Sequence, residues 1–307
     1  MLNSIKESPL HLIVNPKSIA FFGASNNFSA MGTSQFNSLR ALGFEGTIYP
    51  IHPKEDQVQN LKAYRSVLDL PKVPDLAVLV VPTKIVSELL EECGQKGIRH
   101  AIIVSGGFKE VGTEGAEHEQ ELVEIANKYG IRFLGPNCIG VANPYQNLNT
   151  TFLRYSGVPG FIGMASQSGS FVTQMFNYLS RLSLGFSTAF SVGNEANLDI
   201  VDCMGYLGIC PNTRVIALYI EGIRRGREFV EMARSTIPYK PIVALYVGGS
   251  ETGRRAGFSH TGALAGPDQL YDGVFRQSGV IRAYSIGELF DMCWVLGCLP
   301  KPRGPRV

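Results

Sequence analysis

The chain has 307 residues, of which 45% are hydrophobic and 18% are charged, as in a globular protein with a substantial core. At about 150 residues per domain, this length predicts two domains. The formal net charge of +2 gives no general electrostatic reason to bind nucleic acid or a membrane surface. No apolar run approaches the ~18 residues of a membrane-spanning helix, and residues 1–16 lack the pattern of a secretory signal. We therefore expect a cytoplasmic protein.

Six cysteines are scattered along the chain, without a Cys-x-x-Cys pair or histidines at metal-ligand spacing. Such cysteines are usually small, buried packing residues. The sequence therefore predicts no metal site. The cysteines are Cys93, Cys138, Cys203, Cys210, Cys293 and Cys298.

The first half alternates short apolar runs with longer amphipathic segments. Continuously apolar strands that alternate with helices indicate a parallel sheet covered on both faces. Thr83 is the predicted N-cap of one helix. The predicted strands are 18–23, 46–51, 75–81, 100–104 and 132–134, and the predicted helices are 33–42, 83–96 and 114–129.

The second half repeats this alternation after a turn-rich stretch, 136–159, which we interpret as the connection between domains. Both halves are therefore predicted to be doubly wound α/β units. The tail, 300–307, has the composition of a linker and suggests a further piece downstream. The predicted strands are 161–165, 186–192, 214–220, 241–247 and 280–283, and the helices are 169–180, 198–207, 226–235, 267–277 and 285–296.

Two features of the first half point to a phosphate-bearing ligand. In open parallel sheets, ligands bind beyond the carboxyl ends of the strands. The turn that begins at Gly23 can present amides to phosphate oxygens, although without a full Gly-x-Gly-x-x-Gly it also fits an ordinary turn. The second strand leads to Pro53 and Lys54, where a nicotinamide site usually has an acidic residue. The lysine suits an additional phosphate, as in coenzyme A or NADP.

The second half contains a histidine in a glycine-rich loop. His260 lies in GFSHTGALAG, residues 257–266, between a predicted strand and a predicted helix. Neutral imidazole is a good nucleophile near neutral pH. Glu221 ends another predicted strand, where a carboxylate can accept a proton from one ring nitrogen and leave the other free to attack phosphorus. Alone, such a histidine is more often inert, and Glu221 is equally well a solvated carboxylate.

The ordered motifs resemble those of nucleoside-diphosphate-forming acyl-CoA synthetases. GAS, YPIHPK, VVPT, VSGGF and GPNCIG in the first half resemble the coenzyme A-binding domain. ASQSGS, SVGNEA and SHTGALAG resemble the phosphohistidine domain. The resemblance implies an α/β fold with a Rossmann-like coenzyme A-binding domain at 1–145, a flavodoxin-like domain at 146–299 and a linker-like tail at 300–307.

The same resemblance implies functional residues. His260 would carry the phosphoryl group and Glu221 would orient it. Arg254 and Arg255 are candidates for the positive charge of a family lysine that is absent from 246–250. Coenzyme A would contact Gly23, Ala24, Ser25, Asn26, Lys54, Pro82, Ser105 and Gly106, with Asn137 near the thiol, and phosphate would contact Ser168, Gly169, Gly193 and Gly262.

The family reaction converts an acid, coenzyme A and ATP into acyl-CoA, ADP and phosphate. The resemblance implies that ATP or ADP with Mg²⁺ binds an ATP-grasp β-type subunit or fused domain, and we expect an oligomer. A small carboxylic acid and phosphate are the expected substrates, and the sequence does not assign the acyl group. A non-catalytic module that senses coenzyme A or acyl-CoA, and an NADP-dependent oxidoreductase, remain open alternatives.

Overall fold

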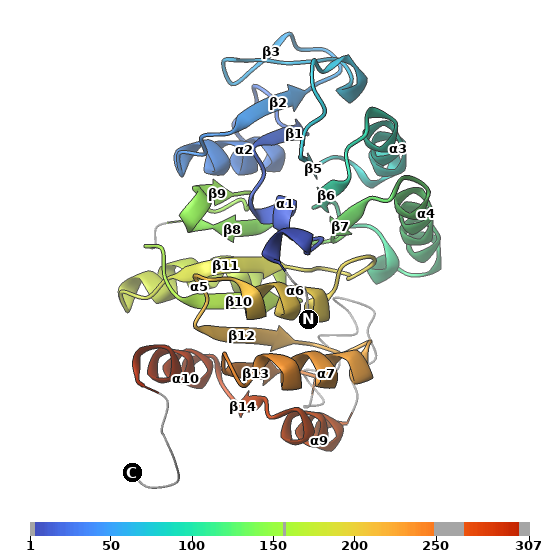
Figure 1. Cartoon of the computed structure of the whole chain (residues 1–307). Coiled ribbons are helices and arrows are strands. Elements are labelled where there is room, and N and C mark those ends of the chain that lie inside the picture. Colours follow the sequence, from blue (N-terminus) through green and yellow to red (C-terminus); the bar gives the residue numbers. More distant parts are fainter. Residues whose placement is uncertain (1–3, 156–157, 249–266, 301–307) are drawn as a thin grey trace, which may run out of the picture.

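The chain folds into two α/β units, which lie one above the other in Figure 1. The structure is a computed structural model, and it describes residues 4–155, 158–248 and 267–300. Each unit has a sheet with helices on its faces. The predicted doubly wound architecture is confirmed.

The first sheet is parallel and has the strand order β2-β1-β5-β6-β7. The order reverses between β1 and β5, which makes this pair the topological switch point where ligands bind in such sheets. Its strands are β1 (Ser18–Phe22), β2 (Thr47–Ile51), β5 (Leu76–Leu79), β6 (His100–Ile103) and β7 (Arg132–Leu134). Its other elements are α1 (His11–Val14), α2 (Met31–Ala41), α3 (Val86–Lys96), α4 (Thr113–Tyr129), the hairpin β3 (Gln57–Val58) and β4 (Leu61–Lys62), and the 3-10 helices η1 (Ile5–Glu7), η2 (Val67–Asp69), η3 (Thr83–Ile85) and η4 (Lys109–Val111).

The second sheet has the order β14-β13-β12-β10-β11-β8-β9. Five strands are parallel and repeat the order of the first sheet, with the switch point between β10 and β12, whereas β8 and β9 are antiparallel additions. The strands are β8 (Val141–Asn143), β9 (Leu148–Asn149), β10 (Ile162–Ser166), β11 (Phe186–Ser191), β12 (Val215–Ile220), β13 (Ile242–Tyr246) and β14 (Ile281–Ala283). The helices are η5 (Pro144–Gln146), α5 (Gly169–Arg181), α6 (Ile200–Ile209), α7 (Gly226–Thr236), α9 (Asp268–Ser278) and α10 (Ile286–Cys298).

Two local predictions were wrong. The turn-rich connection contains β8 and β9, which extend the second sheet. Thr83 is not an N-cap, because it begins η3, and its Oγ1 donates instead to the carbonyl of Gly106 at 2.5 Å. The domain division at residue 145 stays a prediction, and β8 lies before that division although it pairs in the second sheet.

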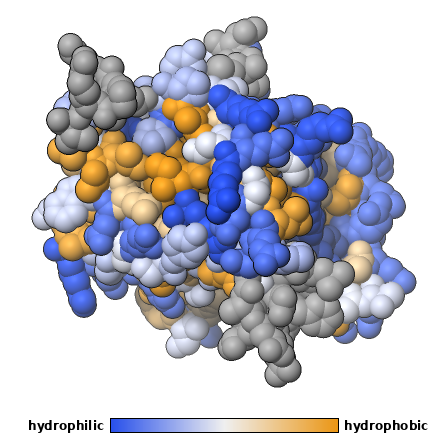
Figure 2. Space-filling view, turned by 90° about the horizontal axis from the view of Figure 1, so that it is seen from below, coloured by the Kyte–Doolittle hydropathy of each residue, from blue (hydrophilic) through white to orange (hydrophobic). Residues whose placement is uncertain are grey.

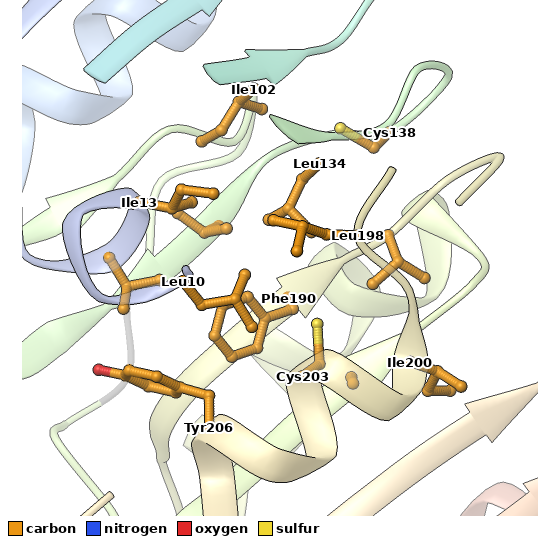
Figure 3. Close-up of a cluster of buried hydrophobic side chains, with 14 of the residues drawn as sticks. Leu10, Ile13, Ile102, Leu134, Cys138, Phe190, Leu198, Ile200, Cys203 and Tyr206 are labelled. Atoms are coloured by element: carbon orange, nitrogen blue, oxygen red, sulfur yellow. The ribbon is translucent and has the colours of Figure 1, made fainter. Parts of the chain in front are cut away.

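A shared apolar core joins the two units. Phe190 of β11 and Leu198 lie in one buried cluster with Ile102 of β6 and Leu134 of β7, and Figure 3 shows these side chains facing one another across the junction. The side chain of Asn143 donates to the carbonyl of Val14 at 2.9 Å, which adds a polar contact between the units. The carboxyl ends of the first sheet are therefore held near the second unit.

An apolar groove lies at the far end of the second sheet. Between α7, α10 and the β14 edge lies a groove of about 430 Å³, and Figure 2, viewed from this end, shows patches of apolar side chains among polar ones. This face lies opposite the first sheet in Figure 1. The large exposed apolar residues that line the groove are Ile281, Val295 and Leu299.

Candidate functional site

The turn after β1 lies at the switch point of the first sheet. Gly23 has φ +93°, and a Cβ atom there would lie 1.9 Å from the carbonyl oxygen of Val80. Only glycine fits, because the backbone is left-handed and the loops after β1 and β5 touch. Ala24 is buried, with 1% of its surface exposed, and its contact with coenzyme A stays a prediction.

The next residues of this turn are tied to the β3–β4 hairpin. The side-chain amide of Asn26 donates to the carbonyl of Gln57 at 3.0 Å and accepts from the amide of Gln59 at 3.0 Å. The Gln59 side chain donates to the carbonyl of Ser25 at 3.0 Å. The Asn26 side chain therefore shapes the turn, and its contact with coenzyme A stays a prediction.

Other predicted coenzyme A residues lie on loops that follow the strands of the same sheet. Lys54 and Pro82 are exposed. Ser105 is buried, and its hydroxyl donates to the carbonyl of Val81 at 2.6 Å. A Cβ atom on the exposed Gly106 would lie 3.2 Å from Oδ1 of Asn137. The structure thus brings Gly106 and Asn137 side by side.

The predicted phosphate residues on the second sheet lie at two loop turns. Ser168 is the N-cap residue of α5, and Gly169 begins the helix. The Ser168 hydroxyl makes no capping bond, and the N-terminus of a helix attracts anions. Gly193 has φ +58°, and a Cβ atom there would lie 2.2 Å from the carbonyl oxygen of Pro136. Gly193 therefore packs against the first unit, and its contact with phosphate stays a prediction.

Gln167 connects these turns to Glu221, and its role was missed from the sequence. Its Oε1 accepts from the backbone amides of Glu221 at 2.5 Å and Gly222 at 3.0 Å. Its Nε2 donates to the carbonyl of Gly222 at 2.7 Å and to Glu195 at 2.8 Å. All the hydrogen-bonding capacity of this amide is used, so Gln167 holds the loop after β12 in place.

Glu195, also missed, lies in the loop between β11 and α6. Burial raises the pKa of Glu195 to about 8, and the charge of Asp199 adds to the increase. Hydrogen bonds from Gln167 and from the amide of Ile200, at 2.9 Å, oppose it. The position of Glu195 in the SVGNEA motif was the only signal available from the sequence.

His260 and Gly262 lie outside the described residues, as do Arg254 and Arg255. The hydroxyl of Tyr271 on α9 accepts from the amide of Ile223 at 3.2 Å and so fixes the segment that follows Glu221. Across residues 4–155, 158–248 and 267–300, no group of three or more side chains is suited to hold a metal ion. In the same ranges, no helix is both long and apolar enough to cross a bilayer.

All six cysteines are free thiols; Cys298 is exposed and the other five are buried. Their predicted role in packing is therefore confirmed for those five. Cys138, beside Asn137, is buried, and its thiol donates to the carbonyl of Ile103 at 3.4 Å. Burial raises the pKa of this thiol to about 12, so it stays protonated at neutral pH.

Two doubly wound sheets with polar groups at their switch points define an α/β protein of the class whose ligands bind beyond the carboxyl ends of the strands. Residues 17–144 match the CoA binding domain, and residues 159–296 match the succinyl-CoA ligase like flavodoxin domain. The chain belongs to the ADP-forming acyl-CoA synthetase family. The resemblance inferred from the motifs is confirmed.

The similarity to known proteins extends over almost the whole chain. It is 43% identical over 302 residues to the acetate–CoA ligase [ADP-forming] I subunit alpha of Pyrococcus furiosus, a match that covers 97% of this chain and 65% of that protein. It is 42% identical over 294 residues to the 4-hydroxybutyrate–CoA ligase [ADP-forming] of Nitrosopumilus maritimus, covering 94% of this chain and 42% of that protein. This chain is thus shorter than both relatives.

A solved structure confirms the arrangement of the two units. The dinucleotide forming acetyl-coenzyme A synthetase 1 of Ca. Korarchaeum cryptofilum, in complex with phosphate and ADP, superposes with a TM-score of 0.92 at 39% identity. The match covers 97% of this chain and 64% of that chain.

Proposed function

We propose that this chain provides the coenzyme A-binding and phosphohistidine parts of an acid–thiol ligase. The reaction joins an acid to coenzyme A while ATP becomes ADP and phosphate. One observation carries the proposal: the predicted coenzyme A residue Gly106, the predicted thiol-end residue Asn137 and the predicted orienting residue Glu221 lie around a single connecting loop, 192–199. The similarity to acetate–CoA ligase subunits supports it.

The chemistry proposed for the chain's own residues is the one that the family resemblance implies. In the direction of ATP synthesis, phosphate displaces coenzyme A from the acyl-CoA and gives an acyl phosphate. One nitrogen of His260 then bonds to phosphorus as the phosphorus–oxygen bond to the acid breaks, and the acid leaves as a carboxylate. Glu221 accepts the hydrogen bond of the other ring nitrogen and stabilises the positive charge on the ring.

The remaining step needs a second component. The phosphoryl group on His260 passes to ADP, which we assign with Mg²⁺ to an ATP-grasp β-type subunit or a fused domain. The two relatives from Pyrococcus furiosus are named as alpha subunits, which supports such a partner. Relatives of similar identity are named for acetate and for 4-hydroxybutyrate, so the acyl group stays unassigned. A cytoplasmic location also stays a prediction.

Labelling of His260 tests the proposal. The chain is incubated with phosphate, Mg²⁺ and a panel of acyl-CoAs that includes acetyl-CoA, and phosphohistidine is read by mass spectrometry. The unmodified chain should gain the label, His260→Ala should gain none, and Glu221→Gln should be about 100-fold slower, the usual effect of losing such a group. His118→Ala, which changes an exposed histidine on α4, is the matched control. Tight acyl-CoA binding without label would instead indicate the sensing module.

Ligand preference tests the first unit separately. Calorimetric titration should show tighter binding of coenzyme A than of NADPH, and the reverse result would favour the oxidoreductase. Gly23→Ala should weaken binding at least ~10-fold, because its Cβ would collide with Val80. Gly43→Ala is the control, since Gly43 has a similar φ of +83° but a Cβ atom there would have no other atom within 4 Å.

A further inference from the structure

The loop between β11 and α6, residues 192–199, makes polar contacts with both candidate ligand regions. Asn194 is buried, with 1% of its surface exposed. Its backbone amide donates to the carbonyl of Pro136 at 2.9 Å, and its side-chain oxygen accepts from Nδ2 of Asn137 at 3.2 Å. A residue of the second unit is thus fixed against the predicted thiol-end residue of the first.

The same asparagine reaches the loop that contains Gly106. Its Nδ2 donates to Glu110 at 2.6 Å and to Glu119 at 2.8 Å. The other oxygen of Glu110 accepts from the amides of Gly107 at 2.5 Å and Phe108 at 3.2 Å. Through Glu110, Asn194 therefore holds the backbone of the predicted coenzyme A loop.

The side chain of the next residue, Glu195, contacts the loops of the second sheet instead. Its carboxyl group accepts from Gln167 at 2.8 Å, and Gln167 in turn accepts from the amide of Glu221 at 2.5 Å. The Arg224 guanidinium donates to the carbonyl of Glu195 at 2.9 Å. Two adjacent residues thus connect, by opposite routes, to the loops on which the proposed reaction depends.

We propose that Asn194 and Glu195 are positioning residues that hold the coenzyme A loop of the first sheet and Glu221 of the second sheet in one fixed relative geometry. The proposal rests on the proposed function, because it concerns how thiol and phosphoryl chemistry meet. Its physical basis is that the donors and acceptors of the Asn194 side chain, and of Gln167, have partners on or beside these loops. A misplacement of about 1 Å can lower a reaction rate ~100-fold.

The test compares two buried asparagines that each join the units. Asn194→Ala removes the side-chain contacts with Asn137, Glu110 and Glu119 but keeps the backbone contact with Pro136. Asn143→Ala removes the contacts with Val14 and Asn15, which involve none of the predicted site residues. The rate of His260 labelling is measured against acyl-CoA concentration, alongside thermal unfolding. We expect Asn194→Ala to lower the maximal rate about 10- to 100-fold while the half-saturating acyl-CoA concentration changes less than about threefold. Asn143→Ala should lower stability without lowering the rate.

A second variant keeps the test decisive if Asn194→Ala does not fold. Glu110→Ala, at a half-buried residue of η4, removes the hydrogen bond between Asn194 and Glu110 from the other partner. It should reduce the maximal rate in the same way. If Gln167 and Asn194 act through one geometry, the double variant Gln167→Leu with Asn194→Ala should lose clearly less rate than the product of the two single losses. An unmodified chain that takes no label contradicts the proposed function. The positioning role is overturned if the unmodified chain takes the label and Asn194→Ala and Glu110→Ala are labelled at the same maximal rate. It is also overturned if these two variants are slowed only as much as Asn143→Ala.

Discussion

Glu195 shows what a single buried carboxyl group does to the energetics of the molecule. Burial raises its pKa to about 8, against an ordinary value of 4.5. The folded state therefore binds this proton more tightly than the unfolded state does. The resulting stability is complete below about pH 4.5 and is lost as the pH rises through about 8.

This difference predicts a pH-dependent stability. The free energy of unfolding in urea should fall by about 2 kcal/mol between pH 6 and pH 8 because of Glu195 alone. Glu195→Gln should flatten this slope, whatever its effect on absolute stability. Glu119, whose pKa burial raises to about 7, should contribute a further decrease that Glu119→Gln removes. An equal slope in the unmodified chain and in Glu195→Gln would contradict the assignment.

Helix α6 begins in a capping box that also carries an ion pair. Asp199 accepts from the amides of Val201 at 2.8 Å and Asp202 at 3.2 Å, and the Asp202 carboxylate accepts from the amide of Asp199 at 3.0 Å. Arg225 of the segment before α7 donates to Asp199 at 2.6 Å and to Asp202 at 2.8 Å. The cap therefore orients α6, whose side chains fill the junction seen in Figure 3.

Removing this cap should destabilise the protein measurably. We expect Asp199→Ala to lower the free energy of unfolding by about 2 kcal/mol, the upper range for an N-cap. The loss is large because the ion pair between Asp199 and Arg225 is removed together with the cap. Asp199→Asn should cost less, since an asparagine side chain still caps the helix. Ser66→Ala, in the capping box of the short η2, is the control and should cost less than about 1 kcal/mol. Equal losses at Asp199 and Ser66 would contradict this account.

At the scale of the whole molecule, the shared core predicts that the two units unfold together. Phe190 is fully buried in a cluster with residues of both sheets. Calorimetry should show one transition, with equal calorimetric and van't Hoff enthalpies. Phe190→Ala should lower the free energy of unfolding by about 3–5 kcal/mol and lower the unfolding temperature of both units. Two transitions, of which only one moves in Phe190→Ala, would show that the units are independent.

Much of this organisation was predictable from local patterns. The alternation of apolar strands with amphipathic helices depends on neighbouring residues, and it predicted the five parallel strands of each sheet. The strands β8 and β9, three and two residues long, were missed because no α-helix separates them from β7 or from each other, so they fall outside the alternation. The pairing of β8 with β11, and of β9 with β8, is a tertiary event that such short segments do not signal.

For the candidate site, the sequence by itself determined where the chemistry-bearing loops fall, because glycines and strand ends are local features. It predicted Gly23, Gly106 and Glu221 as site residues in this way. Only the tertiary structure decided the partners of Asn194 and Gln167, which lie 84 and 54 residues away along the chain at Glu110 and Glu221. Hydrogen bonds across such separations form only after both sheets have packed on their common core, so no periodicity in the sequence encodes them.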